Sequence, residues 1–200
     1  MLIHLQVERI NKTDYSSDYA FQADLSQTVN SLNDGHYYWQ SCYSTAFSTN
    51  HYTPIVSLKD GENGETAIHL APNLPIFAAQ NGLLDTFATN GYNLSDLAGA
   101  KVISIESQSP WDYLDKVSGP AGGLYQDPEQ RLNFQLASYT SIYGGVGLNP
   151  GQFTQTVSFD KDELKLSVKT LSGQEVDVAS PWLTTYRNRD GWSFQSGEEL

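Results

Sequence analysis

The stretch Lys101-Val-Ile-Ser-Ile-Glu-Ser-Gln-Ser-Pro-Trp-Asp-Tyr-Leu114 contains the signals that decide the fold of this 200-residue chain. Its first six residues predict a strand whose buried positions are Val102, Ile103 and Ile105. A polar turn follows, and then Pro110, a residue typical of the first position of a helix, with Ser109 as the N-cap. The order strand, turn, helix indicates a domain in which helices pack against a sheet.

Working outward from this stretch, the sequence predicts more strands than helices. We expect strands at 37–43, 53–58, 66–71, 153–159, 163–171 and 175–178, a hairpin turn at 60–65 and a flexible loop at 144–151. We expect helices at 19–32, from 110 and from 127, while 81–98 holds a short helix or a loop. The fold class is therefore α+β, with a small helical N-terminal region before a β-rich domain.

The composition excludes several classes of partner. The net charge is −12 with no basic run, which excludes nucleic acid and anionic membrane surfaces, since phosphates are bound by clustered Lys and Arg. No apolar run reaches the length of a membrane span. The 4 Trp, 12 Tyr and 8 Phe are enough to build a hydrophobic core, so the chain is globular.

The composition also suggests an extracellular location. Lys and Arg total only 11, and sequons begin at Asn11 and Asn93. Cys42 is the only cysteine, so it has a partner outside this chain or is a buried thiol. The first residues are too short and too polar for a signal peptide, and both observations would follow if the chain were a piece of a longer secreted protein.

His36 is the candidate catalytic residue. It follows the turn sequence Asn33-Asp34-Gly35 and precedes three aromatic residues, so it lies where a helix gives way to a predicted strand. A histidine at such a position can carry a proton near neutral pH. The alternative is an ordinary half-buried histidine that makes hydrogen bonds at the start of a strand.

Other chemical motifs are missing or weak. There is no Gly-x-Ser-x-Gly and no His-Glu-x-x-His, and histidines 4, 36, 51 and 69 lack metal-ligand spacing, so we expect neither a metal nor a cofactor. His69 lies within a predicted strand and is interpreted as structural. Ser158 and Lys161 match Ser-x-x-Lys, but between predicted strands, and the glycines at 122–123 and 144–147 are interpreted as plain loops.

Two segments resemble a known family. The Lys101–Leu114 stretch looks like the strand, turn and Pro-x-Asp-Tyr-Leu helix of a PDZ-like domain, and Tyr125-Gln-Asp-Pro-Glu-Gln-Arg-Leu-Asn133 looks like the segment that follows it in secreted tail-specific-protease-like serine peptidases of fungi and oomycetes. These peptidases are similar to the chlamydial protease-like activity factor. In that family an Asp-x-His precedes an aromatic strand, and its catalytic histidine falls on His36. Pro181-Trp182 and Gly191–Gly197 resemble the linker to the catalytic domain.

The resemblance implies a division of the chain and an incomplete active site. Residues 1–64 would carry the catalytic histidine, 65–178 would form the PDZ-like domain, and 179–200 would lead to a missing catalytic domain that supplies the serine. The chain alone would then be inactive, because a serine peptidase needs nucleophile and base together. The alternative is a stand-alone PDZ-like module that holds an extended peptide by strand addition. In both cases the expected partner is a peptide or protein.

Overall fold

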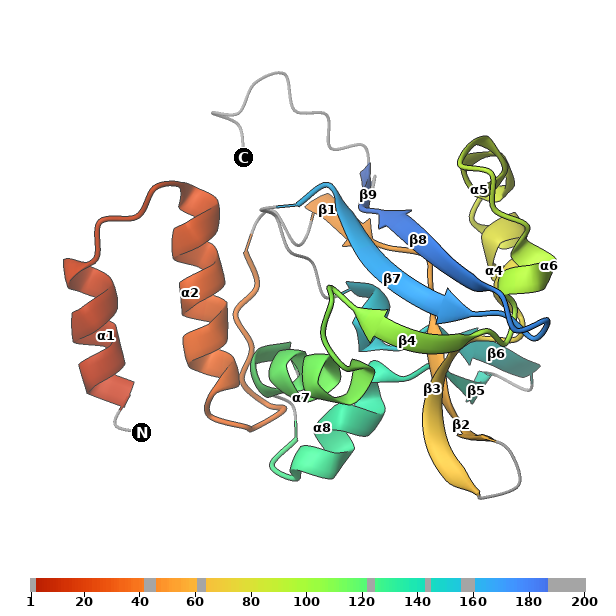
Figure 1. Ribbon diagram of the computed structural model, residues 1–200. Coiled ribbons are helices and arrows are strands. Elements are labelled where there is room, and N and C mark those ends of the chain that lie inside the picture. The colour runs from red at the N-terminus through yellow and green to blue at the C-terminus, as the bar shows by residue number, and fades with distance from the viewer. Residues whose placement is uncertain are drawn as a thin grey trace.

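The computed structural model describes residues 3–41, 46–60, 64–121, 125–142, 145–155 and 161–186 (Figure 1). Over these residues the fold is α+β, with a helical N-terminal region beside a β-rich domain, which confirms the predicted fold class. Predictions that concern Cys42, Ser158, the glycines at 122, 123 and 144, and Gly191–Gly197 fall outside the described residues.

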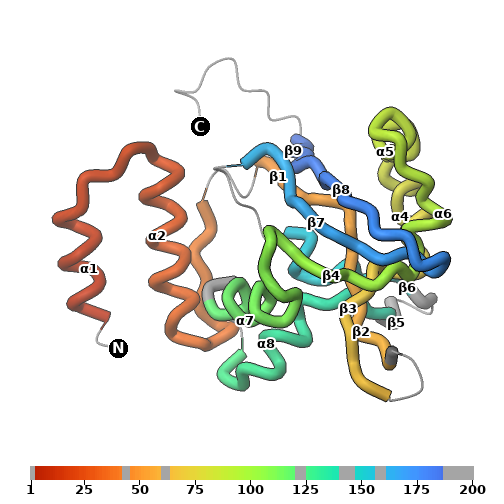
Figure 2. The backbone as a smooth tube through the Cα atoms, viewed as in Figure 1, coloured from red at the N-terminus to blue at the C-terminus, as the bar shows by residue number. Residues whose placement is uncertain are grey.

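Two helices form the N-terminal region. Helix α1 (Ile3–Lys12) was not predicted, whereas α2 (Asp18–Asn30) matches the prediction and is capped by Ser17, whose side chain accepts a hydrogen bond from the Ala20 N–H. The two helices lie side by side, and α2 also contacts helix α7 of the β-rich domain. Figures 1 and 2 show this hairpin at one side of the sheet.

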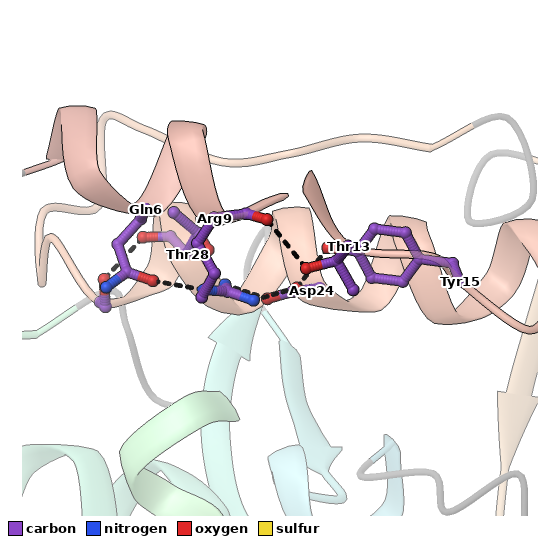
Figure 3. A network of polar contacts seen from close by, with 7 residues as sticks. Gln6, Arg9, Thr13, Tyr15, Asp24 and Thr28 are labelled. Carbon is purple, nitrogen blue, oxygen red and sulfur yellow. Dashed lines mark hydrogen bonds and ion pairs between the residues drawn. The ribbon is translucent and has the colours of Figure 1, made fainter. Parts of the chain in front are cut away.

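A polar network joins α1 to α2 (Figure 3). The Arg9 guanidinium donates two hydrogen bonds of 2.6 Å to the Asp24 carboxylate, and the Tyr15 hydroxyl donates a third. The hydrogen bond from Arg9 is the main cause that lowers the pKa of Asp24 to about 2. Charge-assisted bonds therefore stabilise a contact in which α1 buries little apolar surface besides Ile10.

A five-stranded antiparallel sheet forms the centre of the β-rich domain. Its strand order is β2-β3-β4-β7-β8, with bounds Ile55–Asp60, Glu65–Leu70, Lys101–Ile105, Glu163–Lys169 and Glu175–Pro181. Two further antiparallel pairs are β1 (Phe47–Asn50) with β9 (Leu183–Tyr186), and β5 (Ser138–Ile142) with β6 (Gly145–Asn149). The β2–β3 hairpin and the strands β4, β7 and β8 were expected from sequence.

Helices follow two of the central strands. After β3 come α4 (Leu74–Gln80), α5 (Leu84–Thr89) and α6 (Leu94–Leu97), and after β4 come α7 (Pro110–Ala121) and α8 (Pro128–Gln135). Figure 1 places α7 and α8 next to the N-terminal hairpin, and α4 to α6 at the opposite side. One apolar cluster fills the interior, with Leu70, Ile105 and Val168 from the sheet and Leu74 and Leu114 from the helices.

Several sequence predictions were wrong in detail. Ile103 is 40% exposed, because neighbouring residues of a strand point to opposite faces and Val102 faces the core; the register shift between Val102 and Ser104 then lets Ile105 face the core as well. Residues 145–149 form strand β6 instead of a loop, and Gln152–Gln155 is a 3₁₀ turn instead of the start of a strand. Tyr37–Ser41 is not a strand, since no neighbouring strand pairs with it in the described part of the chain.

The predicted division into 1–64, 65–178 and 179–200 stays a prediction. Strand pairing crosses its limits, because β2 pairs with β3 across residue 64. The first and last parts are joined by the pairing of β1 with β9, in which Phe47 lies opposite Tyr186.

Candidate active-site histidine

The turn that carries His36 follows directly from the end of α2. The Ser31 hydroxyl donates to the Thr28 carbonyl, and Asn33 has a φ of 51°, a left-handed conformation that Asn tolerates better than most residues. The Tyr37 N–H then donates to the Asp34 carbonyl at 3.1 Å, which closes a β-turn with Gly35 and His36 at its centre.

Asp34 orients the imidazole of His36. One carboxylate oxygen of Asp34 accepts the backbone N–H of His36 at 3.0 Å and lies 2.7 Å from the ring Nδ1. The hydrogen bond from the His36 backbone is the main cause that lowers the pKa of Asp34, so this group is a carboxylate at neutral pH. Because a carboxylate only accepts, Nδ1 carries the hydrogen, and in the neutral form of the ring the lone pair is on Nε2.

The exposure of His36 leaves this lone pair accessible. The His36 side chain is 94% exposed, and Nε2 lies on the opposite edge of the ring from Asp34. An imidazole held by a carboxylate at Nδ1 and open at Nε2 is the arrangement of a general base that lacks only its proton donor. Whether His36 is catalytic stays a prediction.

Sequence reasoning placed the turn after the helix correctly but assigned no role to Asp34. The signal was available in the spacing Asp34-Gly35-His36, because an Asp side chain commonly accepts the N–H two residues further along. The exposed aromatic residues Tyr37, Tyr38 and Trp39 border the turn, and the Trp39 Nε1–H donates to the side chain of Gln22 on α2 at 2.7 Å.

Two further histidines, His51 and His69, are buried. His51 is fully buried between the rings of Phe153 and Trp182, lies 2.9 Å from the Thr53 hydroxyl through Nδ1, and lies 2.9 Å from the Phe153 carbonyl through Nε2. Burial lowers its pKa to about 3, so the ring is neutral. His69 lies in β3, where a strand was predicted, with Nδ1 3.0 Å from the Gly99 carbonyl.

Within the described ranges, no group of three or more His, Cys, Asp and Glu side chains could hold a metal ion. The same ranges contain no helix that is both long and apolar enough to cross a membrane.

A small pocket of about 10 Å³ lies at the other side of the domain, between α5 and the end of β8. Its lining is mostly apolar and includes Leu83, Phe87 and Leu183. Ser180 also lines it, and its buried Oγ has no hydrogen-bond partner among the described residues. Strand β8 is one of the two edge strands of the sheet, and its Ala179 N–H donates to the Tyr92 hydroxyl at 3.0 Å.

Comparison with known proteins gives two similar crystal structures. No model of a known protein family matches the sequence, and no curated protein matches it. The chain is similar to mature CPAF, the chlamydial protease-like activity factor, complexed with lactacystin, with a TM-score of 0.49 and 11% identity over 91% of this chain and 28% of CPAF. A structure of a CPAF mutant gives 0.48 and 11%, over 91% and 27%.

The chain thus spans little more than a quarter of the length of CPAF. Neither of these two structures is that of a fungal or oomycete peptidase. Scores and identities this low leave the activity to be argued from the residues themselves.

Proposed function

We propose that this chain is the part of a secreted serine-type endopeptidase that supplies the general base, His36. The observation that carries the proposal is the Asp34–His36 pair, in which a carboxylate holds Nδ1 on an exposed turn and Nε2 remains open. In this proposal the nucleophilic serine comes from a catalytic domain that follows this chain. The secreted location rests on the composition and the two sequons alone.

The proposed reaction uses the His36 ring as the base and the Asp34 carboxylate as the group that stabilises its protonated form. His36 Nε2 takes the proton of the serine hydroxyl as that oxygen attacks a peptide carbonyl, and the resulting imidazolium is stabilised by the Asp34 carboxylate. The same nitrogen then returns the proton to the leaving amine. General-base catalysis of this kind contributes about 10²–10⁴-fold, and its loss costs more where base and nucleophile act as a unit.

The test uses the protein that contains this chain together with its catalytic domain. His36→Ala should reduce kcat for peptide cleavage by at least about 10²-fold and leave the melting temperature nearly unchanged. His4→Ala is the matched control, because His4 is also an exposed histidine, on α1. Near-normal turnover of His36→Ala would contradict the proposal.

A second candidate function is peptide binding without catalysis, at a PDZ-like domain. It is favoured by the apolar pocket beside the edge strand β8. An extended peptide could add to β8 as a further strand. Binding of a peptide library that is lost in Thr86→Arg, which places a bulky charge at the half-buried rim of the pocket, but kept in His36→Ala would support this candidate.

A further inference from the structure

The segment from Tyr125 to Asn133 resembles a family motif, and the proposed function leaves its arginine without a role. Asp127 caps helix α8 by accepting the Gln130 N–H at 3.0 Å, and Pro128 occupies the first turn of the helix. The Arg131 side chain turns back toward the helix start, where its Nη1 donates to the Tyr125 and Gln126 carbonyls, both at 2.9 Å.

The same nitrogen also reaches the turn of the candidate histidine. Nη1 of Arg131 lies 3.5 Å from the side-chain oxygen of Asn33, 98 residues earlier in the chain. Of the hydrogen bonds that the structure describes for residues 33–37, this contact alone reaches the β-rich domain. At 3.5 Å it is longer than an ordinary hydrogen bond, and because the two hydrogens of Nη1 already point to the Tyr125 and Gln126 carbonyls, it is mainly an attraction between the guanidinium charge and the amide oxygen.

The contact falls at the residue that sets the direction of the turn. Asn33 has a positive φ, and Asp34, the residue that orients His36, follows it directly. A shift of the Asn33 backbone would therefore move the Asp34 carboxylate relative to the imidazole. Pre-organisation of this kind matters, because catalytic groups act only within a narrow range of geometry.

We propose that Arg131 is a positioning residue that fixes the Asp34–His36 pair through Asn33. The role of this contact in catalysis rests on the proposed function, but the coupling of Arg131 to His36 can be measured in this chain alone. The alternative is that Arg131 only stabilises the start of α8 through its hydrogen bonds to the Tyr125 and Gln126 carbonyls. The two readings differ in whether the side chain of Asn33 matters to His36.

Two variants separate these readings in the 200-residue chain. Asn33→Gly removes the side chain but keeps the left-handed backbone, which glycine adopts readily, and it leaves the contacts of Arg131 with α8 intact. Arg131→Gln removes both sets of contacts. Lys116→Gln, at an exposed lysine on α7, is the matched control for loss of one positive charge, and Asp34→Asn shows the signal of a broken pair.

The readouts are the tautomer of the neutral His36 ring, from long-range ¹H–¹⁵N NMR correlations, and the amide exchange rates of His36 and Tyr37. We expect the unmodified chain to show Nδ1–H. Arg131→Gln and Asn33→Gly should both shift the ring toward the tautomer of Asp34→Asn, and should speed exchange at His36 and Tyr37 about two- to tenfold, the range of one hydrogen bond. Lys116→Gln should change neither.

An unchanged ring and unchanged exchange in Asn33→Gly would overturn the inference, whatever Arg131→Gln does. The Gln130 amide, bonded to Asp127, reports whether Arg131→Gln has merely unfolded the start of α8. Since neither readout is turnover, the outcome is independent of the test of His36→Ala. If His36→Ala kept normal turnover, the contact would have no role in catalysis, but the coupling between Arg131 and the Asp34–His36 pair would still hold.

Discussion

One carboxylate oxygen of Asp34 meets two hydrogen-bonding groups of His36, the backbone N–H at 3.0 Å and the ring Nδ1 at 2.7 Å. The first contact fixes the carboxylate on the turn, and the second fixes the ring on the carboxylate. Both contacts of the pair are therefore made within three consecutive residues, 34–36.

Asp34→Asn should impair catalysis more than stability in the protein that contains the catalytic domain. An amide can donate to Nδ1 and favour the wrong tautomer, so we expect kcat to fall by about 10² or more, with a change in melting temperature of a few degrees at most. Peptide cleavage and thermal unfolding measure the two effects. Asp18→Asn, at an acid in the first turn of α2, is the control; equal kcat in both variants would contradict the role of Asp34.

Asp24→Asn should release helix α1 from α2. The Arg9 guanidinium and the Tyr15 hydroxyl would lose their shared carboxylate. Because the ion pair is partly exposed, we expect the free energy of unfolding to fall by only about 0.2–1 kcal/mol. Amide exchange in α1 should speed up while exchange in the sheet stays unchanged. Since the pKa of Asp24 is lowered to about 2, its contribution is complete above pH 3.8 and is lost as the pH falls toward 2. Unchanged exchange in α1 would contradict this account.

Local signals in the sequence predicted α2, α7, α8 and the β2–β3 hairpin, because caps, prolines and polar turns act within a few residues. They missed strand β6 and wrongly predicted a strand at Tyr37–Ser41. Whether a segment becomes a strand depends on whether the fold supplies a neighbouring strand: the glycine-rich segment of β6 has one, and the aromatic segment has none among the described residues. For the same reason the turn of His36 could be predicted from Asn33-Asp34-Gly35, but the contact of Asn33 with Arg131 could not.

Ser107→Gly should stabilise the protein. Glu106 and Ser107 have φ values of 50° and 62° between two residues, Ile105 and Gln108, that exchange backbone hydrogen bonds, an arrangement that favours glycine. Relief of the left-handed strain, less the added entropy of the unfolded chain, should raise the free energy of unfolding by about 0.5–1 kcal/mol. Chemical denaturation measures it, and Ser104→Gly, within β4 and without positive φ, should instead be destabilising. A loss of stability in Ser107→Gly would refute the strain argument.

The stability of the domain should fall as the pH drops below about 6.5 because of His51. Its side chain meets Thr53, Phe153 and Trp182, none of them charged, and burial lowers its pKa to about 3. Between pH 6.5 and about 3, His51 is protonated in the unfolded chain but remains neutral in the folded chain. Stability from this source is therefore complete above pH 6.5 and decreases by up to about 1.4 kcal/mol per pH unit below it.

His51→Gln separates the titration of His51 from that of the carboxylates, because the carboxylates titrate alike in the variant and in the unmodified protein. Glutamine can still donate to the Phe153 carbonyl and accept from Thr53, but it does not titrate and it loses the two ring contacts. We expect the variant to be less stable at pH 7 by about 1–3 kcal/mol, and the deficit to shrink as the pH falls from 6.5 to 4.5. Urea denaturation across this range measures both quantities. A deficit that stays constant with pH would show that His51 takes up its proton in the folded state as easily as in the unfolded chain.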